Sequence, residues 1–478
     1  MKILLINSPT EGRIPAQFPL GLGYIAKVLL NEGYQVEVLD IWSKQYTKEQ
    51  IMKIIPKLKY DLVGINAISV HYNFVKWLSK KLKEHHSGKI ILGGALPTFS
   101  SEIVLKNTEV DICVLGEGEI TIINLLNNWD NISKVNGIHY KNNGKIIKNT
   151  EREYIKNLDI IPFPAWELFP IKNYLKTPAS LEGYGINSMN IISARGCPYR
   201  CEYCSKTFKS CRLRSVDNII EEIKELKKRY GIKVIDFNDE LVLISKSRML
   251  ELCKKIALLK IKWTCQGRTN VVDYEMLSEM KKAGCYEVGY GIESGSQKIL
   301  DNMKKDTTVE IAIKAVLETK KAGIKPALQS MFGYTGENHD TIKETIEFYN
   351  TIHDHPASES SITTPFPGTV LYDNLKQKGL IKDEEKYLED LKETGQYIIN
   401  LTEFPDNKVV EIRNKMDKKI LQNYYKYRRR HPVIFLRDYS YKFKRFFRYV
   451  KHYGLMTAAI NVFNTLKTNP GLIFQSEY

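Results

Sequence analysis

Residues 194–204 read Ala194-Arg195-Gly196-Cys197-Pro198-Tyr199-Arg200-Cys201-Glu202-Tyr203-Cys204. The three cysteines are separated by three residues and then by two, and they follow a short apolar run at 189–193 that is typical of a buried strand. Three thiolates on one short loop can close on a single point, which suits a [4Fe-4S] cluster and leaves its fourth iron without a protein ligand. Zinc is the alternative, with Cys211 as the obvious fourth ligand.

Short apolar runs alternate with helical patterns on the C-terminal side of this loop. Together with the run before the loop they give six strand candidates: 189–193, 233–237, 262–266, 286–292, 326–331 and 360–364. Six strands with helices between them predict a partial (β/α)6 TIM-like barrel. Barrels place their active sites at the carboxyl ends of the strands, so the residues at those ends are candidates for chemistry.

Polar and glycine residues gather at those strand ends. They are Asn238-Asp239-Glu240, Arg268, Gly291-Ile292-Glu293-Ser294-Gly295 and Gly333-Tyr334-Thr335-Gly336-Glu337. Each is a weak signal alone, because an Asp-Glu pair is usually solvated and glycines usually mark turns. Their common position after successive strands favours a shared site.

The spacing CxxxCxxC, with Tyr203 before the last cysteine, resembles the cluster motif of the radical S-adenosylmethionine (SAM) superfamily. The resemblance implies that Cys197, Cys201 and Cys204 hold a [4Fe-4S] cluster whose open iron binds SAM. The further SAM-site residues that it implies are Tyr203, Asn238, Asp239, Glu240, Arg268, Glu293 and Gly333. Asn238-Asp239-Glu240 departs from the family's usual Gly-Gly-Glu. An external low-potential electron donor, of the flavodoxin or ferredoxin type, is an implied partner.

The first third of the chain has a second βα rhythm. Its strand candidates are 2–7, 35–41, 61–69, 89–92 and 110–115, with helical patterns such as 20–31 and 72–84 between them. This alternation predicts an α/β domain with a doubly wound, Rossmann-like parallel sheet. The residues expected beyond the carboxyl ends of its strands are Asn7-Ser8-Pro9, Ser69, Gly93-Gly94 and Gly116-Glu117-Gly118-Glu119. Each of these segments is equally compatible with a simple tight turn.

This N-terminal region resembles the cobalamin-binding (B12-binding) domain that precedes the barrel in the corrinoid branch of the superfamily. The branch is typified by the anaerobic magnesium-protoporphyrin IX monomethyl ester cyclase and by carbon methyltransferases, and the two resemblances cover roughly residues 1–400. They imply cobalamin contacts at Ser69, Gly93, Gly94, Gly116, Glu117 and Gly118. The Asp-x-His-x-x-Gly segment that ligates cobalt in other cobalamin domains is absent from residues 8–19. We interpret His71, the first histidine, as a surface residue.

Four regions follow from these patterns. Residues 135–150 predict a hairpin that turns at Asn142-Asn143-Gly144, and a proline-containing connector follows at 159–164. We therefore predict a cobalamin-binding domain at 1–150, a linker at 151–185, the barrel at 186–382 and a helical C-terminal region at 383–478.

The C-terminal region is basic and rich in aromatic residues. From Lys408 onward the chain has 16 Lys and Arg against 4 Asp and Glu, which supplies +12 of the total net charge of +16. Residues 437–451 combine Phe443, Phe446 and Phe447 at helical spacing with basic residues between them. One interpretation is a cap packed on the barrel, and the other is peripheral binding to an anionic membrane surface that offers a lipid substrate. Nucleic acid is not expected as a partner.

The composition agrees with a folded protein in a reducing compartment. Of 478 residues, 43% are hydrophobic and 26% are charged, and eight cysteines are too few for a disulfide scaffold. We find no signal peptide and no run of about 18 apolar residues. We therefore expect a cytoplasmic protein, either free or peripheral at the inner face of the membrane.

The predicted function is that of a cobalamin-dependent radical SAM enzyme. Such an enzyme cleaves SAM to a 5′-deoxyadenosyl radical, and we expect methylation of an unactivated carbon in a lipid or other small molecule. A ring-forming or oxidative reaction without methyl transfer is the alternative within the branch. A corrinoid-binding sensor is the alternative from another class of protein.

Overall fold

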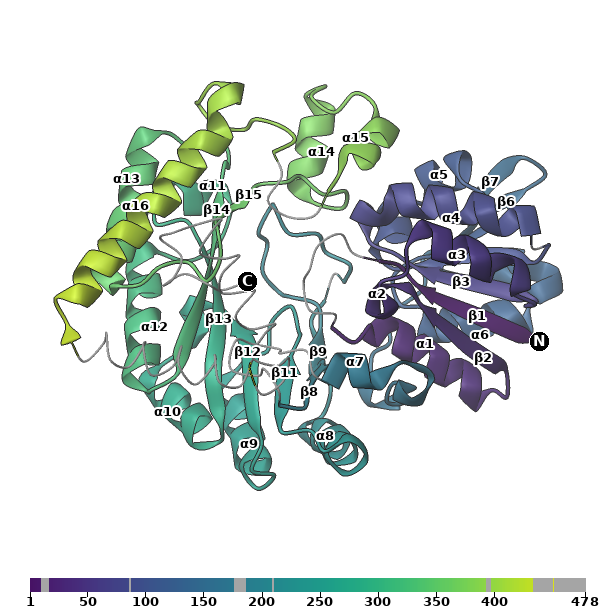
Figure 1. The fold of residues 1–478 in the computed structure, drawn as a ribbon, viewed down its shortest axis with the longest axis horizontal. Helices are drawn as coiled ribbons and strands as arrows, with labels where there is room; N and C mark the ends of the chain where they lie inside the picture. Colours follow the sequence, from purple (N-terminus) through teal and green to yellow (C-terminus); the bar gives the residue numbers. More distant parts are fainter. Residues whose placement is uncertain are drawn as a thin grey trace. The chain divides into compact units, whose positions relative to one another are not determined.

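The computed structural model describes residues 1–9, 17–85, 87–175, 186–208, 210–392, 397–432 and 450 (Figure 1). The chain divides into two compact units, and neither is continuous in sequence. The first unit comprises Met1–Asn173, Ser193–Asn218 and Thr364–Ile398. The second unit comprises Tyr174–Ile192, Ile219–Thr363 and Ile399–Tyr478. The predicted domain ranges stay a prediction, since compact units and domains need not coincide.

A seven-stranded sheet forms the centre of the first unit, in the order β2-β1-β3-β4-β5-β6-β7. Its parallel strands are β1 (Lys2–Asn7), β2 (Gln35–Asp40), β3 (Leu62–Asn66), β4 (Lys89–Gly93) and β5 (Ile112–Val114). The side chains from Ile3 to Ile6 are buried, as expected for a parallel strand with neighbours on both sides. The predicted doubly wound sheet is confirmed, and β1 has the bounds that its apolar run predicts.

The predicted hairpin extends this sheet. β6 (Ile138–Asn142) pairs antiparallel with β5, and β7 (Lys145–Lys148) pairs antiparallel with β6. Asn143 and Gly144 connect the two strands with φ values of 47° and 76°, the left-handed conformations that a two-residue type I′ turn requires. The turn residues predict the hairpin, but they carry no information about the strand on which it docks.

Helices from distant parts of the sequence complete the first unit. They are α1 (Leu20–Asn31), α2 (Ile41–Lys44), α3 (Lys48–Ile54), α4 (Tyr72–His85), α5 (Ala95–Asn107), α6 (Glu119–Asn127), α14 (Val370–Gln377) and α15 (Glu384–Asp390). The Tyr72 hydroxyl of α4 donates to Glu385 of α15 at 2.7 Å. The Lys76 ammonium forms ion pairs of 2.8 Å with Glu385 and 2.9 Å with Glu389. These contacts attach the late segment that contains α15 to the N-terminal sheet.

The second unit contains a six-stranded parallel sheet in the order β15-β14-β13-β12-β11-β8. The strands are β8 (Ser188–Ile191), β11 (Val234–Phe237), β12 (Lys262–Gly267), β13 (Cys285–Glu293), β14 (Lys325–Phe332) and β15 (Ser361–Ile362). Strands that follow one another in the chain lie side by side, and the sheet curls into a half-barrel (Figure 1). All six predicted strands are present, which confirms the predicted partial barrel.

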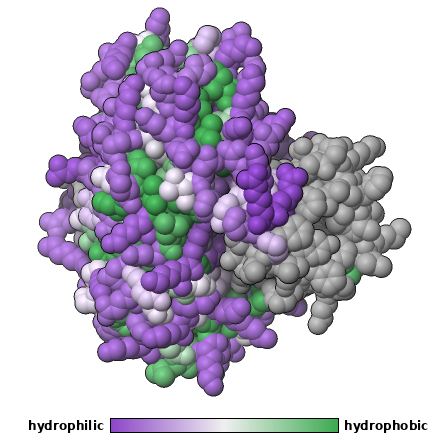
Figure 2. Space-filling view, turned by 90° about the vertical axis from the view of Figure 1, so that its left-hand side faces the viewer, coloured by the Kyte–Doolittle hydropathy of each residue, from purple (hydrophilic) through white to green (hydrophobic). Residues whose placement is uncertain are grey.

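Helices follow these strands in the chain. They are α9 (Lys246–Ala257), α10 (Tyr274–Lys282), α11 (Gln297–Asn302), α12 (Val309–Lys321), α13 (His339–Ile352) and α16 (Val409–Arg429), while α7 (Ile171–Leu175) and α8 (Val216–Tyr230) each span a boundary between the units. In β12, Trp263 is fully buried, and its indole N–H donates to the Ala283 carbonyl at 2.9 Å. Figure 2 shows a mainly hydrophilic outer face with hydrophobic residues in separate areas, as amphipathic helices produce.

α16 is the last helix in the described part of the chain. The predicted basic amphipathic helix at 437–451 lies, apart from Val450, outside the described residues. Among the described helices, none is long and apolar enough to cross a membrane.

Candidate functional site

The cysteine-containing loop is closed at its base by a short two-stranded sheet in the first unit. β9 (Ala194–Arg195) pairs antiparallel with β10 (Arg212–Leu213), so that Arg195 lies opposite Arg212. Between them, Gly196 has a φ of 89°, and a Cβ atom at this position would lie 2.3 Å from the Ser210 carbonyl oxygen. Only glycine fits both the left-handed backbone and this close approach. The loop that carries the three cysteines therefore leaves the base in a fixed direction.

All three predicted ligands lie on this loop, and none of them forms a disulfide in the described part of the chain. Cys201 is buried, Cys197 is half-buried and Cys204 is exposed, and the Cys204 N–H donates to the Cys201 carbonyl at 3.3 Å. The backbone N–H of Leu371, at the start of α14, donates to the Glu202 carbonyl at 3.0 Å. In the described part of the chain, no three His, Cys, Asp or Glu side chains form an assembled metal site. Three cysteine side chains on a short anchored loop are nevertheless the donor set that a [4Fe-4S] cluster takes.

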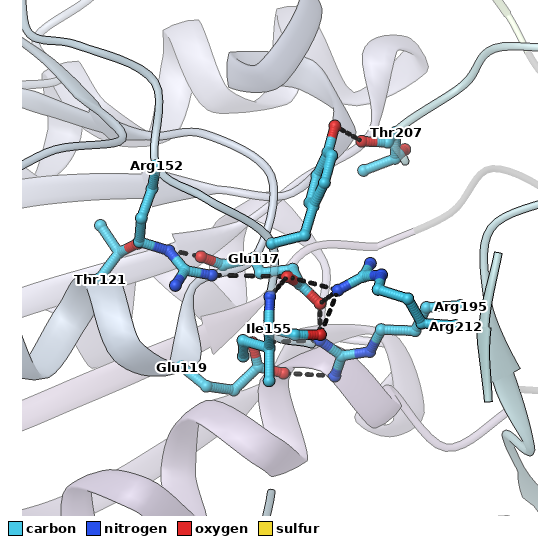
Figure 3. A network of polar contacts seen from close by, with 9 residues as sticks. Glu117, Glu119, Thr121, Arg152, Ile155, Arg195, Thr207 and Arg212 are labelled. Atoms are coloured by element: carbon cyan, nitrogen blue, oxygen red, sulfur yellow. Dashed lines mark hydrogen bonds and ion pairs between the residues drawn. The ribbon is translucent and has the colours of Figure 1, made fainter. Parts of the chain in front are cut away.

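The base of the cysteine loop is tied to the loop after β5 by a buried group of charges (Figure 3). One Glu117 carboxylate oxygen accepts from Arg195 at 2.8 Å and from Arg212 at 2.9 Å. The other oxygen accepts from the Ile155 N–H at 2.7 Å and lies 3.4 Å from Arg152. Arg195 also forms an ion pair with Glu119. The Glu117 side chain is fully buried, so protein groups surround the whole carboxylate.

The carboxylates also decide the charge state of Arg195. Burial acts to lower the pKa of this guanidinium, but Glu119 and Glu117 outweigh it and raise the pKa above its usual value. Arg212 is held in addition by aromatic rings, with its guanidinium carbon 4.8 Å from the centre of the Tyr154 ring and 5.1 Å from that of Phe208. Phe208 follows the cysteines, so the C-terminal end of the cysteine loop packs on this cation, while Tyr154 comes from the segment after β7.

The predicted glycine contacts in the first unit differ in the space around them. A Cβ atom added to Gly93 or Gly116 would meet nothing within 4 Å. At Gly94, with a φ of 102°, it would lie 2.5 Å from the Ala67 carbonyl oxygen, and at Gly118 it would lie 2.8 Å from Ile25. Gly93 and Gly116 thus have open space directly beside their backbone, while a side chain at either of the other two glycines would collide with its neighbours.

Ser69 and His71 lie in the segment after β3. Ser69 is buried, and the Nδ1 atom of His71 accepts from the Ile68 N–H at 3.3 Å. His71 is not the surface residue that the sequence suggested, since its Nε2 atom is buried without a hydrogen-bond partner among the described residues. Burial lowers the pKa of His71 to about 4, so the imidazole is neutral at physiological pH.

In the second unit, two predicted SAM-site residues are joined by a third residue that the sequence did not single out. Arg268 donates to the Lys305 carbonyl, and the Lys305 ammonium lies 2.7 Å from the Glu293 carboxylate. Both side chains of this ion pair are less than one-tenth exposed, at 8% and 9%. Glu293 has a φ of 63°, in the left-handed region. Gly291 leaves room for the Glu293 carboxylate, because a Cβ atom at position 291 would collide with it. The sequence gives no signal for Lys305, because two adjacent lysines, Lys304 and Lys305, are usually solvated.

The remaining predicted residues occupy other strand ends of the second unit. After β11, Asp239 is buried while Asn238 and Glu240 are exposed. After β14, the Gly333 N–H donates to Glu337 at 2.7 Å. Burial raises the pKa of Glu337 to about 7. Tyr203 belongs to the cysteine loop of the first unit and is half-buried.

Comparison with known proteins gives two family matches. The description "Radical SAM superfamily" matches residues 191–349, and "B12 binding domain" matches residues 16–126. An uncharacterized methyltransferase from Pyrococcus horikoshii is 33% identical over 390 residues, which cover 78% of this chain and 83% of that protein. The anaerobic magnesium-protoporphyrin IX monomethyl ester cyclase of Cereibacter sphaeroides is 27% identical over 77% of this chain and 62% of its own length.

Solved structures agree on the fold. The radical S-adenosylmethionine methyltransferase TsrM from Kitasatospora setae, determined with cobalamin and a [4Fe-4S] cluster bound, superposes with a TM-score of 0.65. The match covers 79% of this chain and 75% of TsrM at 16% sequence identity. The order of the two α/β folds along the chain is therefore shared with an enzyme of known structure.

Gly196→Ala should prevent cluster assembly, because the added methyl group meets the Ser210 carbonyl and destabilises the left-handed backbone by about 1–2 kcal/mol. We expect iron and sulfide content after anaerobic reconstitution to fall severalfold. Gly144→Ala is a matched control, since Gly144 also has a positive φ but a Cβ there meets nothing within 4 Å. Equal iron content in the two variants would show that the base of the loop does not position the cysteines.

Gly93→Phe should weaken cobalamin binding by about tenfold or more, which corresponds to ~1.4 kcal/mol, because the ring fills the open space beside β4. Its φ lies outside the left-handed region, so the substitution does not strain the backbone. Hydroxocobalamin titration measures the effect, and iron content should stay unchanged. Gly21→Phe, on an exposed position of α1 with equal free space, is the control. Unchanged affinity in the Gly93 variant would exclude this loop from the cobalamin site.

Glu337→Gln should change how stability depends on pH. In the folded protein the pKa of Glu337 is about 7, above the ordinary value of 4.5. The contribution of this carboxyl group to the free energy of unfolding is therefore fully present below pH 4.5 and is lost as the pH rises through 7, because the buried group must then ionise. The shift corresponds to about 3 kcal/mol, and glutamine retains the neutral acceptor for Gly333. Relative to the parent, the variant should therefore become more stable between pH 5 and pH 8 in urea unfolding. A pH-independent difference would contradict the buried, protonatable carboxyl.

Proposed function

The chain belongs to the radical SAM superfamily, among the enzymes that carry a B12-binding domain, and we propose that it methylates an unactivated carbon atom. It is a cobalamin-dependent enzyme whose cofactors are a [4Fe-4S] cluster, SAM and cobalamin. The observation that carries the proposal is that the loop with the three cysteines and the glycines Gly93 and Gly116, which have open space beside them, belong to the same compact unit. A methyl carrier and a radical source are the two components that such a methylation needs.

When bound, the cluster supplies an electron that cleaves SAM to a radical, and cobalamin supplies the methyl group. The protein's own residues bind and orient these groups. Cys197, Cys201 and Cys204 would hold three irons, while Gly93 and Gly116 would admit the corrin ring. In the second unit, Arg268 and Glu293 carry the opposite charges that the carboxylate and ammonium of methionine require. Lys305 restrains both residues, so these charges are fixed before a ligand arrives.

The substrate is a small molecule, and a reductant must activate the cluster. For the finer assignment we favour a lipid or other hydrophobic compound reached at the anionic inner face of the membrane. The +12 charge from Lys408 onward supports this choice, because each basic residue near such a surface contributes about 1 kcal/mol of attraction. A flavodoxin or ferredoxin in the cytoplasm would serve as the electron donor.

A second candidate is a ring-forming or oxidative reaction without methyl transfer. The similarity to the magnesium-protoporphyrin IX monomethyl ester cyclase favours it, at 27% identity over 77% of this chain. The two candidates differ in the fate of the methyl group, and isotope labelling distinguishes them.

Expression with cobalamin and deuteromethyl-methionine should yield a compound that carries a trideuteromethyl group in place of a hydrogen. Mass spectrometry of lipid and small-molecule extracts would identify it. A variant with Cys197, Cys201 and Cys204 all changed to alanine is the control, since it lacks cluster ligands but keeps the cobalamin loops. A product that loses hydrogen without gaining label would favour the cyclase-type reaction, and the absence of any new product would contradict both.

A further inference from the structure

The Glu117 carboxylate lies between two loops that have different predicted cofactors. On one side, it follows Gly116 in the loop after β5, where the resemblance implies cobalamin. On the other side, it accepts from Arg195 and Arg212, the opposed residues at the base of the cysteine loop. All these residues belong to the first unit.

We propose that Glu117 is a positioning residue that couples the cysteine loop to the cobalamin loops, so that cluster assembly and cobalamin binding strengthen each other. The inference concerns the occupancy of the two cofactor sites. It rests on the assignment of cobalamin to the glycine loops, and it holds whether the enzyme methylates, cyclises or oxidises its substrate.

A continuous chain of hydrogen bonds supports the coupling. The Thr98 hydroxyl donates to the Gly94 carbonyl at 2.7 Å and accepts from the Gly116 N–H at 3.0 Å. It thus joins the loops after β4 and β5. Glu117, the residue after Gly116, accepts hydrogen bonds from Arg195 and Arg212 at the base of the cysteine loop (Figure 3). The chain of contacts therefore runs from the loop after β4 to the cysteine loop.

The burial of these charges makes the connection stiff. The side chains of Arg195 and Arg212 are 8% and 9% exposed, and that of Glu117 is 0% exposed. A buried charge that loses its partner is strongly unfavourable, because water cannot replace the partner. The cysteine loop therefore cannot rotate about its base while Glu117 stays in place, and Glu117 cannot move without shifting the adjacent Gly116.

Two further contacts hold the base of the cysteine loop independently of Glu117. Arg195 pairs with Glu119 at the start of α6, and Arg212 donates to the Ile155 carbonyl at 2.7 Å. The replacement of Glu117 by glutamine keeps its size and leaves these contacts available. It removes the negative charge that faces both arginines and replaces one acceptor oxygen with an NH2 group, so the variant should be less stable than the parent, and circular dichroism must show that it folds before it is titrated.

The experiment measures hydroxocobalamin affinity in two forms of the full-length protein, one stripped of iron by chelation and one with the cluster reconstituted anaerobically. In the parent, the cluster should lower the dissociation constant by about tenfold, within the usual range for coupled sites. In Glu117→Gln the ratio of the two constants should fall toward one, with only the part of the coupling left that the Arg195–Glu119 pair transmits. Glu102→Gln is the matched control, because it removes an exposed ion pair with Lys148 in the same unit, and it should keep the parental ratio.

This ratio separates positioning from a purely structural role. A merely structural network would lower stability or weaken both affinities equally, and would leave the ratio unchanged. A ratio of one in the parent, or a parental ratio in Glu117→Gln, overturns the proposal, as does a protein that binds no hydroxocobalamin. None of these results depends on product formation, so the methylation experiment succeeds or fails separately.

A second pair of variants guards against misfolding of Glu117→Gln. Arg195→Lys and Arg212→Lys keep the positive charge but lose the planar fork that allows one side chain to hold several oxygens. Each should give a ratio between one and the parental value. If both retain the parental ratio, the guanidinium contacts do not transmit the coupling and the proposal is wrong.

Discussion

Two arginines must be buried at the base of the cysteine loop, and this requirement organises the first unit. Arg195 and Arg212 leave water when β9 pairs with β10, and a low-dielectric interior accepts such charges only beside carboxylates. Glu117, from a loop 78 residues earlier in the chain than Arg195, supplies that partner. The loop therefore belongs to the N-terminal sheet structurally, although in sequence it falls between strands of the half-barrel.

Both units contain buried ion pairs near their predicted cofactor contacts. In the first unit, Glu117 is enclosed by arginines, and in the second unit Lys305 holds Arg268 and Glu293. In each case the charges are ordered by protein partners before a cofactor binds, which reduces the entropy lost on binding. Glycines complete the arrangement where side chains would collide, as at Gly196 and Gly291. The chemistry belongs to the cofactors, and the protein's contribution is placement.

Much of this fold could be predicted from the sequence, because buried parallel strands and amphipathic helices leave local periodic signals. The bounds of β1, α1 and the hairpin turn follow from such signals. Arg195, Arg212 and Lys305 could not be identified in this way, since a cation looks the same in sequence whether it is solvated or buried. His71 was misjudged for the same reason. The docking of Thr364–Ile398 on the N-terminal sheet depends on contacts such as Tyr72 with Glu385, which no local pattern encodes.

We propose that one chain uses SAM both as a radical source and as a methyl donor. The most direct test is to quantify the nucleoside products of SAM during turnover of the anaerobically reconstituted protein with cobalamin, a reductant and an extract that contains substrate. We expect 5′-deoxyadenosine and S-adenosylhomocysteine to form in equal amounts, since each methyl transfer consumes one SAM molecule in each role. Formation of 5′-deoxyadenosine without S-adenosylhomocysteine would contradict methyl transfer, and the absence of 5′-deoxyadenosine would contradict radical chemistry altogether.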